Sequence, residues 1–223
     1  MPAYRSSAEA EIRDAVVGSI RLYRPDARII HEINTRDDNT NRIDVLAVCK
    51  SEIIAVEIKS ERDKLDRLDA QMKAMSRCAH HAIAAIHEKF LVERVTNEYA
   101  AHYERDGVFY LKELPKGLSF RNAWVFPEKP RALNYDSLAK WQFPASRTEY
   151  ALPQHALCLL WRDELLMLCS MLNVSASARS TVNELSRSLR WQRNGKELTQ
   201  GVCRLLRARE CAEADAPILE VAA

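Results

Sequence analysis

Hydrophobic residues in the first part of the chain change from helical spacing to strand spacing. Apolar side chains recur every three or four residues between Ile12 and Tyr23, so we expect a helix that begins at a cap on Ser6 or Ser7 and ends before Pro25. Short runs rich in Val, Ile and Ala follow this helix. They predict strands at 28–34, 43–48, 53–58 and 82–86.

Two of these strands form a predicted β-hairpin. The runs at 43–48 and 53–58 are separated by the four residues 49–52, which is a common length for a hairpin loop. If Val48 pairs with Ile53, the pairing continues outward residue by residue, and alternate side chains share a face of the sheet. The register therefore decides which polar side chains meet at the far end of the hairpin.

Charged residues occupy that far end, where a core strand would be apolar. In the expected register Asp44 lies opposite Glu57, and Arg42 lies opposite Lys59. Two opposed carboxylates repel each other, so a cation is expected between them, and Mg²⁺ takes carboxylate and carbonyl oxygens. Lys59 is close enough to reach an attacking water or a phosphate oxygen. A solvated sheet face with neutralising charges has the same pattern.

The downstream pattern predicts a mixed α/β sheet. An amphipathic helix is expected at 61–78, followed by the strand at 82–86, a helix at 88–102 and a strand at 107–111. A strand that is reached through a long helix implies a crossover connection. The order helix, three strands, helix, strand is therefore typical of a mixed sheet.

The remaining residues divide into three further segments. Five of the eight prolines and several aromatic residues fall in 112–153, which predicts an irregular arm packed on a core of residues 1–111. Buried anchoring of Trp124 and Trp141 is favoured over base stacking in this arm. Apolar patterns predict a three-helix unit at 154–211, with helices at 155–172, 180–189 and 196–209, and a frayed tail at 212–223.

Composition places the chain among ordinary soluble globular proteins. It has 223 residues, of which 47% are hydrophobic and 29% charged. No apolar run approaches the roughly 18 residues of a membrane span, and the N-terminal residues lack the apolar stretch of a signal peptide. We therefore expect a cytoplasmic location and no membrane partner. The six cysteines are scattered, which favours reduced thiols over disulfides or a zinc site.

Charge is distributed unevenly, although the net charge is only +2. Residues 1–111 contain 17 basic and 19 acidic side chains, whereas residues 112–211 contain 16 basic and 9 acidic ones. A basic excess outside the expected core is suited to holding a phosphate backbone. A mildly basic solvated surface is the alternative.

The segment around the hairpin resembles a known enzyme family. Asp44, the triplet Glu57-Ile58-Lys59 and a following helix with Gln71 are similar to the signature of the metal-dependent PD-(D/E)XK nuclease superfamily. More narrowly, EIKSERDKLDRLDAQMKAMSR resembles a poorly characterised bacterial and phage branch, in which an EIKS strand end leads into a helix with an RL-x-x-Q pattern. Ile43 stands where the name-giving proline would be.

The resemblance implies a restriction-endonuclease-like core with a Mg²⁺ or Mn²⁺ cofactor. It assigns catalysis to Lys59, Glu57 and Asp44, metal ligation to Asp44, Glu57, Ile58 and Glu11, and substrate contacts to Gln71 and Ser60. Helical spacing, however, brings Glu9 nearer than Glu11 to the apolar stripe of the first helix. Spacing and resemblance therefore disagree on this ligand. An exposed glutamine without a task is the alternative for Gln71.

The expected function is metal-dependent hydrolysis of phosphodiester bonds in DNA. The alternative is a non-catalytic DNA-binding or protein-interaction module that retains a nuclease-like fold. The C-terminal helices faintly resemble SAP-type DNA-binding modules, but a bundle used for homodimerisation or structural support would have the same pattern. DNA is therefore the expected partner, and the C-terminal helices are the expected surface for a second copy of the chain.

Overall fold

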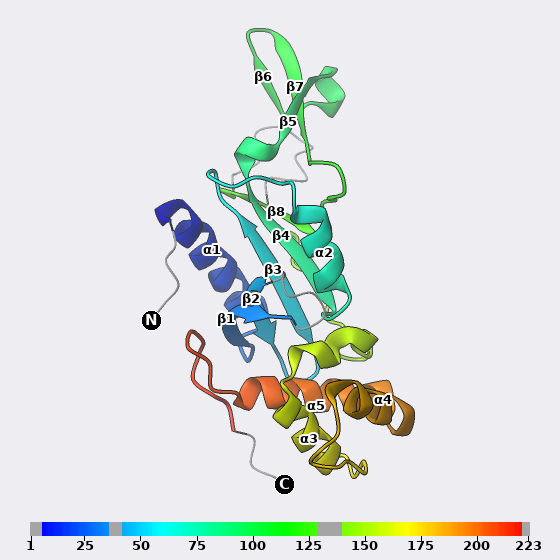
Figure 1. Cartoon of the computed structure of the whole chain (residues 1–223). Helices are drawn as coiled ribbons and strands as arrows, with labels where there is room; N and C mark the ends of the chain where they lie inside the picture. The colour runs from blue at the N-terminus through cyan, green and yellow to red at the C-terminus, as the bar shows by residue number, and fades with distance from the viewer. Residues whose placement is uncertain (1–5, 36–41, 129–139, 220–223) are drawn as a thin grey trace.

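A mixed five-stranded sheet with helices on both faces forms the centre of the molecule. The computed structural model describes residues 6–35, 42–128 and 140–219 (Figure 1). In the order β1-β2-β3-β4-β8, the first three strands are antiparallel and the last two add in parallel. These strands are β1 (Arg28–Asn34), β2 (Arg42–Val48), β3 (Ile53–Lys59), β4 (His81–His87) and β8 (Ala123–Phe126). The expected mixed α/β class is confirmed.

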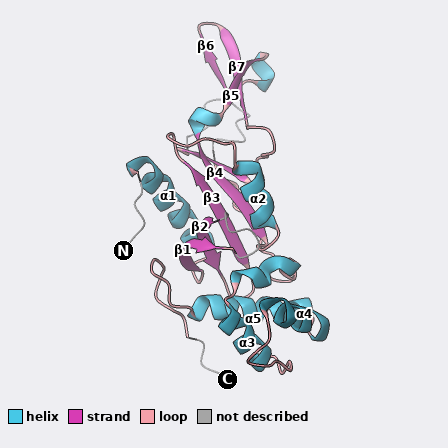
Figure 2. Ribbon diagram, viewed as in Figure 1, coloured by secondary structure: helices cyan, strands magenta, loops and turns pink. Residues whose placement is uncertain are grey.

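The first helix, α1 (Ser7–Tyr23), covers one face of the sheet, as the apolar spacing predicted. Ser6 is its N-cap, because the Ser6 hydroxyl oxygen accepts a hydrogen bond from the Glu9 N–H at 3.2 Å. Apolar residues of α1 are buried against β1, β2, β3 and β4. The opposite face packs against α2 and the C-terminal helices (Figure 2), so the strands lie between two helical layers.

The hairpin of β2 and β3 forms in the predicted register. Val48 pairs with Ile53, and the Cys49 N–H donates to the Glu52 carbonyl at 2.9 Å, which closes the loop. All residues of β3 are buried, because β2 and β4 flank the strand and helices cover both of its faces. Side chains at the end of β3 are therefore held in fixed positions.

The helix expected at 61–78 is shorter than predicted. The observed helix, α2, spans Leu68–Ser76, and turns precede it. In these turns Asp63 Oδ2 accepts hydrogen bonds from the Ser60 N–H at 2.8 Å and from the Ser60 hydroxyl at 2.6 Å. The Asp63 N–H donates to the Ser60 carbonyl at 3.1 Å, so residues 60–63 form a turn that is closed by side-chain and backbone hydrogen bonds before the helix begins.

The helix expected at 88–102 does not form, and that prediction is wrong. The chain instead forms a three-stranded antiparallel sheet of order β5-β7-β6. Its elements are η1 (Glu88–Phe90), β5 (Val92–Val95), η2 (Glu98–Ala100), β6 (Tyr103–Arg105) and β7 (Val108–Glu113). β-branched Val92, Val95 and Thr96 favour this extended backbone. The strand expected at 107–111 thus exists as β7, but in a sheet that projects from the body (Figure 1).

The segment 112–153 is less irregular than predicted, because it contributes β8 to the main sheet. Trp124 of β8 is 1% exposed, and its indole N–H donates to the Gln142 carbonyl at 3.1 Å. Trp141 stacks on Trp124 with ring centroids 5.0 Å apart. The two tryptophans are therefore anchors, as expected, and the main sheet continues beyond the predicted core boundary at residue 111.

Three helices pack at one end of the sheet (Figure 1). They are α3 (Arg162–Met171), α4 (Val182–Gln192) and α5 (Gly195–Ala208), and η3 (Gln154–Leu159) precedes them. The single helix expected at 155–172 is interrupted, because the Glu164 carboxylate accepts a hydrogen bond from the Trp161 N–H at 2.6 Å and so begins a new helix there. The helices expected at 180–189 and 196–209 are confirmed as α4 and α5.

The segment after α5 is attached to β1 and to α5 as far as Ile218, where a frayed tail was expected. Asp215 donates its N–H to the Ile29 carbonyl and accepts from the Ile29 N–H through Oδ2, both at 2.9 Å. The buried Arg28 guanidinium donates to the Asp215 carbonyl at 3.1 Å. The Ile218 N–H donates to the Arg207 carbonyl at 2.8 Å. Residues 220–223 of the expected tail lie outside the described residues.

No helix within the described ranges combines the length and the apolar character needed to cross a bilayer. All six cysteines are free thiols, and four of them are buried, as expected for reduced cysteines packed in a core.

Candidate active site

A polar pocket of about 410 Å³ lies at the carboxyl end of β3. We call it the acidic pocket; it is lined by Glu9, Asn34, Arg42, Asp44, Glu57, Ile58, Lys59, Asp63, Arg67 and Gln71. These residues come from α1, β1, β2, β3, α2 and the turn that precedes α2. The fold thus brings Asp44, Glu57, Lys59 and Gln71 together, as predicted from the sequence.

Asp44 reaches the pocket because the ladder between β2 and β3 ends just before it. The last pair is Val45 with Val56, so Asp44 and Glu57 are not ladder partners as the register alone predicted. Asp44 Oδ2 instead accepts a hydrogen bond from the Ile58 N–H at 2.7 Å. The side chain thus satisfies a backbone donor of β3 where the two strands separate.

Glu57 is almost fully enclosed, with 2% of its surface exposed. Its Oε1 accepts hydrogen bonds from the Lys59 ammonium at 2.7 Å and from the Gln71 amide. Among the described residues, neither Glu57 Oε2 nor Gln71 Oε1 has a hydrogen-bond partner. Because a buried polar atom without a partner costs free energy, these oxygens are acceptors available to a cation.

Burial raises the pKa of both carboxylates in the pocket. Burial raises the pKa of Asp44 to about 6, although the Ile58 hydrogen bond and the Arg13 charge lower it. Burial and then the charge of Asp44 raise the pKa of Glu57 to about 7, although Lys59 and Gln71 lower it. The cations present therefore do not compensate the cost of two buried carboxylates, and a further cation would stabilise their charged forms.

Arg13 of α1 lies next to the acidic pocket and bonds to residues around Asp44. Its buried guanidinium donates to Glu9 Oε1 at 2.7 Å, to Glu32 Oε1 at 2.8 Å and to the Asp44 carbonyl. Glu32 has a φ of 57°, which places it in a backbone region that L-residues seldom occupy. Arg42 forms a further ion pair with Glu32 at 2.5 Å. These contacts fix α1 to β1 and β2 next to Asp44.

The first helix presents Glu9 to the pocket, and the assignment of Glu11 is corrected. Glu9 lines the acidic pocket, whereas Glu11 is exposed and outside its lining. Two residues along a helix correspond to about 200° of rotation, so both side chains cannot face the same pocket. Helical spacing therefore indicated which of the two glutamates lines the pocket.

The turn after β3 changes the expected role of Ser60. Ser60 is buried, bonds to Asp63 and lies outside the pocket lining, whereas Asp63 is part of it. Asn34 and Arg67 also line the pocket and were not predicted as site residues. The Ser-x-x-Asp spacing allows the Asp63 carboxylate to bond back to the Ser60 N–H, and it is the signal that could have identified Asp63.

The donor set fits a hard divalent cation that keeps part of its water shell. No group of three or more His, Cys, Asp and Glu side chains is placed to hold a metal within the described ranges. Asp44, Glu57 and Ile58 nevertheless line one pocket, and Mg²⁺ commonly takes only one or two protein carboxylates. The unpartnered Glu57 Oε2 is the specific observation that agrees with such an ion.

Over its first part the chain is similar to a family of phage proteins. The model of the family described as Bacteriophage P4 protein cII matches residues 3–102, a stretch that contains every residue of the acidic pocket. That description names a protein and states no activity. No curated protein and no solved structure matches the chain.

Proposed function

We propose that the protein is a Mg²⁺- or Mn²⁺-dependent nuclease of the PD-(D/E)XK type that hydrolyses phosphodiester bonds in DNA. The observation that supports this most is the convergence of Asp44, Glu57 and Lys59 in one pocket, with an unpartnered oxygen on Glu57. The element order α1, β1, β2, β3, α2, β4 also agrees with the order expected of such a core.

Each residue of the acidic pocket has a role in this proposal. Asp44, Glu57 and the Ile58 carbonyl would hold the cation, with Glu9 at the margin of the pocket. The cation, when bound, supplies Lewis-acid stabilisation of phosphoryl charge. Lys59, held at 2.7 Å from Glu57 Oε1, would orient the attacking water and stabilise charge on the phosphoryl oxygens. Gln71 keeps the Glu57 carboxylate in its orientation.

A purely structural ion pair between Lys59 and Glu57 explains only part of this arrangement. Such an ion pair does not account for Asp44, whose carboxylate lies in the same pocket. The nearby Arg13 donates to the main-chain carbonyl of Asp44 and not to this carboxylate. The ion pair also leaves the pKa values of both carboxylates raised. Buried structural ion pairs normally have their remaining polar atoms hydrogen-bonded, and Glu57 Oε2 does not satisfy that condition among the described residues.

Cleavage assays with Lys59→Ala test the proposal. Wild type is compared with this variant on single-stranded, duplex and branched DNA in Mg²⁺ or Mn²⁺. Lys73→Ala serves as the control, because Lys73 is exposed on α2 and pairs with Asp69. We expect Lys59→Ala to cleave at least about 100-fold more slowly, and the control to cleave like wild type.

Two other outcomes would contradict the proposal in different ways. Undiminished cleavage by Lys59→Ala would remove the assigned mechanism. Failure of the wild type to cleave any of these substrates, together with retained DNA binding, would favour the non-catalytic binding module.

A further inference from the structure

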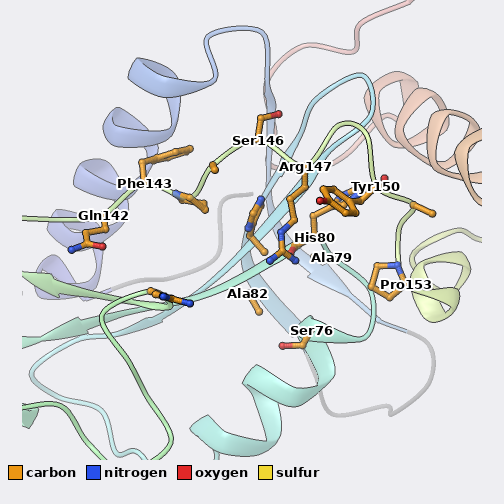
Figure 3. A pocket seen from close by; sticks show the side chains of 15 residues that line it. Ser76, Ala79, His80, Ala82, Gln142, Phe143, Ser146, Arg147, Tyr150 and Pro153 are labelled. Carbon is orange, nitrogen blue, oxygen red and sulfur yellow. Dashed lines mark hydrogen bonds between the residues drawn. The ribbon is translucent and has the colours of Figure 1, made fainter.

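Three adjoining hollows connect the start of β4 with α4. The first, of about 920 Å³, lies between the segment from Gln142 to Pro153 and the ends of α2 and β4 that face it (Figure 3). The second, of about 260 Å³, shares Ala151 and Pro153 with the first. The third, of about 490 Å³, shares Gln154 and Arg190 with the second. Because each hollow shares lining residues with the next, the three are neighbours, and we group them as one groove.

The charged side chains that line this groove are all arginines, so we call it the arginine groove. They are Arg121, Arg147, Arg187, Arg190 and Arg193, and no Asp or Glu is among the described residues that line it. Arg187 and Arg190 are exposed and make no ion pair with a described carboxylate. Glu149, next to the groove in sequence, approaches Lys196 at 3.9 Å. A concave surface of one charge sign concentrates ligands of the opposite sign.

Aromatic side chains stand along the same groove. Tyr150 is 69% exposed and Trp191 is 89% exposed. Tyr150 lies beside Arg147 on the wall of the first hollow (Figure 3), and Trp191 lines the third hollow together with Arg187. An arginine and an exposed ring thus line the same hollow at each end of the groove.

This combination fits one class of ligand, and we propose that the arginine groove binds a single strand of nucleic acid. Phosphates would contact the arginines, and unpaired bases would stack on Tyr150 and Trp191, which is the recognition mode of sequence-tolerant single-strand binders. Bases in a duplex are already stacked on each other and cannot use these rings. Only the further step, delivery of the strand to the acidic pocket as a substrate, rests on the proposed nuclease function.

Binding of labelled oligonucleotides to the full chain tests the proposal independently of cleavage. Fluorescence anisotropy is measured in EDTA with a single-stranded oligonucleotide and with a duplex of the same length. The groove variant is Arg147→Ala/Arg187→Ala/Arg190→Ala. The control is Arg21→Ala/Arg94→Ala/Arg105→Ala, which removes the same charge from exposed arginines on α1 and on the projecting sheet.

We expect the groove variant to bind the single strand at least about tenfold more weakly, and the control variant to change affinity by less than about threefold. The slope of log affinity against log salt concentration should become shallower by about 2 in the groove variant, as expected when three phosphate contacts of a single strand are lost. Trp191→Ala should weaken single-strand binding at least about fivefold and leave duplex binding unchanged.

Thermal unfolding midpoints establish that each variant is folded. If the triple variant is unstable, the single substitution Arg187→Glu at an exposed position tests the same surface. The proposal is wrong if the groove variant binds the single strand like wild type. It is also wrong if polyglutamate displaces the oligonucleotide with equal affinity, because that result would indicate an acidic protein as the partner.

Discussion

Two buried glutamates at opposite ends of β3 differ in how completely their oxygens are bonded. Glu52, which precedes β3, is fully buried, and its carboxylate contacts Arg24 at 2.7 Å, His81 at 3.0 Å and the Arg147 N–H at 2.6 Å. Burial alone would raise the pKa of Glu52, but these contacts hold that pKa at about 2. Glu57 has an unpartnered oxygen among the described residues, and its pKa is raised to about 7.

The same contrast extends to the two cavities. His81 and Arg147, which bond Glu52, line the arginine groove, whereas Glu57 lies in the acidic pocket. Burial of a carboxylate therefore does not by itself identify a reactive site. The number of donors around it decides whether the group is structural or available. In the two proposals above, the fully bonded Glu52 lies beside the groove for a nucleic acid strand, and the incompletely bonded Glu57 lies in the pocket for a cation.

Glu57→Gln is expected to give the largest effect and to separate the two regions. It removes a charge from the acidic pocket and leaves the arginine groove unchanged. Cleavage should fall at least about 100-fold, while single-strand affinity in EDTA should stay within about twofold. Cleavage assays and anisotropy on the same preparation measure both. Loss of binding together with cleavage would show that the acidic pocket, and not the groove, holds the strand.

Glu52→Gln should destabilise the fold by about 3 kcal/mol at neutral pH, because it breaks a buried charged network and leaves Arg24 without its partner. Since the folded pKa of Glu52 lies below its unfolded value of about 4.5, the carboxylate stabilises the fold above pH 4.5, and this contribution is lost as the pH falls towards 2. Urea unfolding of wild type and variant should therefore show a difference that shrinks from pH 5 downward.

The matched control for this prediction is Glu149→Gln, because Glu149 is exposed and its one ion pair with a described residue is a 3.9 Å contact to Lys196. Its effect should stay within about 0.5 kcal/mol at every pH. A difference between wild type and Glu52→Gln that stays constant between pH 5 and pH 2 would contradict the assignment of the lowered pKa to Glu52.

Asp44→Asn tests whether the acidic pocket binds a metal ion through Asp44. The asparagine oxygen can still accept from the Ile58 N–H, so the fold is retained while one of the two repelling charges is removed. Wild type should be stabilised by Mg²⁺ or Mn²⁺, by about 2.7 kcal/mol at a hundredfold excess over the dissociation constant, and the variant should not. Thermal unfolding with and without metal measures this, with the exposed Asp69→Asn on α2 as the control. An unchanged metal effect in Asp44→Asn would exclude Asp44 as a ligand.

The smallest expected effect distinguishes the two glutamates of α1. Glu9→Gln should lower cleavage about tenfold, because Glu9 lines the acidic pocket and holds Arg13 behind Asp44. Glu11→Gln should leave cleavage within about twofold of wild type, since Glu11 is exposed and outside the lining. If Glu11→Gln lowered the initial rate of cleavage more than Glu9→Gln did, Glu11 would be the ligand, as the resemblance implied.

The sequence predicted elements whose buried face is continuous. α1 and the hairpin of β2 and β3 bury regular apolar stripes, so their spacing indicated type, bounds and register. The projecting sheet carries no such signal, because every residue of β5 is exposed and Val95 and Tyr99 happen to recur at helical spacing. Hydrophobic periodicity arises when one face of an element is buried, so a segment without a buried face cannot be identified from its spacing.

The candidate site was predictable only in part for a related reason. Asp44, Glu57 and Lys59 lie close in sequence and at a defined register, so the hairpin alone brought them together. Glu9 and Asp63 enter the acidic pocket through helix packing and a side-chain turn, which spacing describes poorly. The arginine groove is assembled from residues between Ser76 and Val202 and has no local signature at all.

The attachment of residues 213–215 to β1 has a consequence for synthesis of the chain. β1 is an edge strand, and its outer side bonds to Glu213 and Asp215, with Ile29 and Asp215 separated by 186 residues. At about 5–20 residues per second, that edge waits roughly 10 to 40 s on the ribosome for its partner. During this interval its backbone groups can pair with another nascent chain. Pairing of this edge with another nascent chain is therefore a route to aggregation that closes when residues 213–215 bind β1.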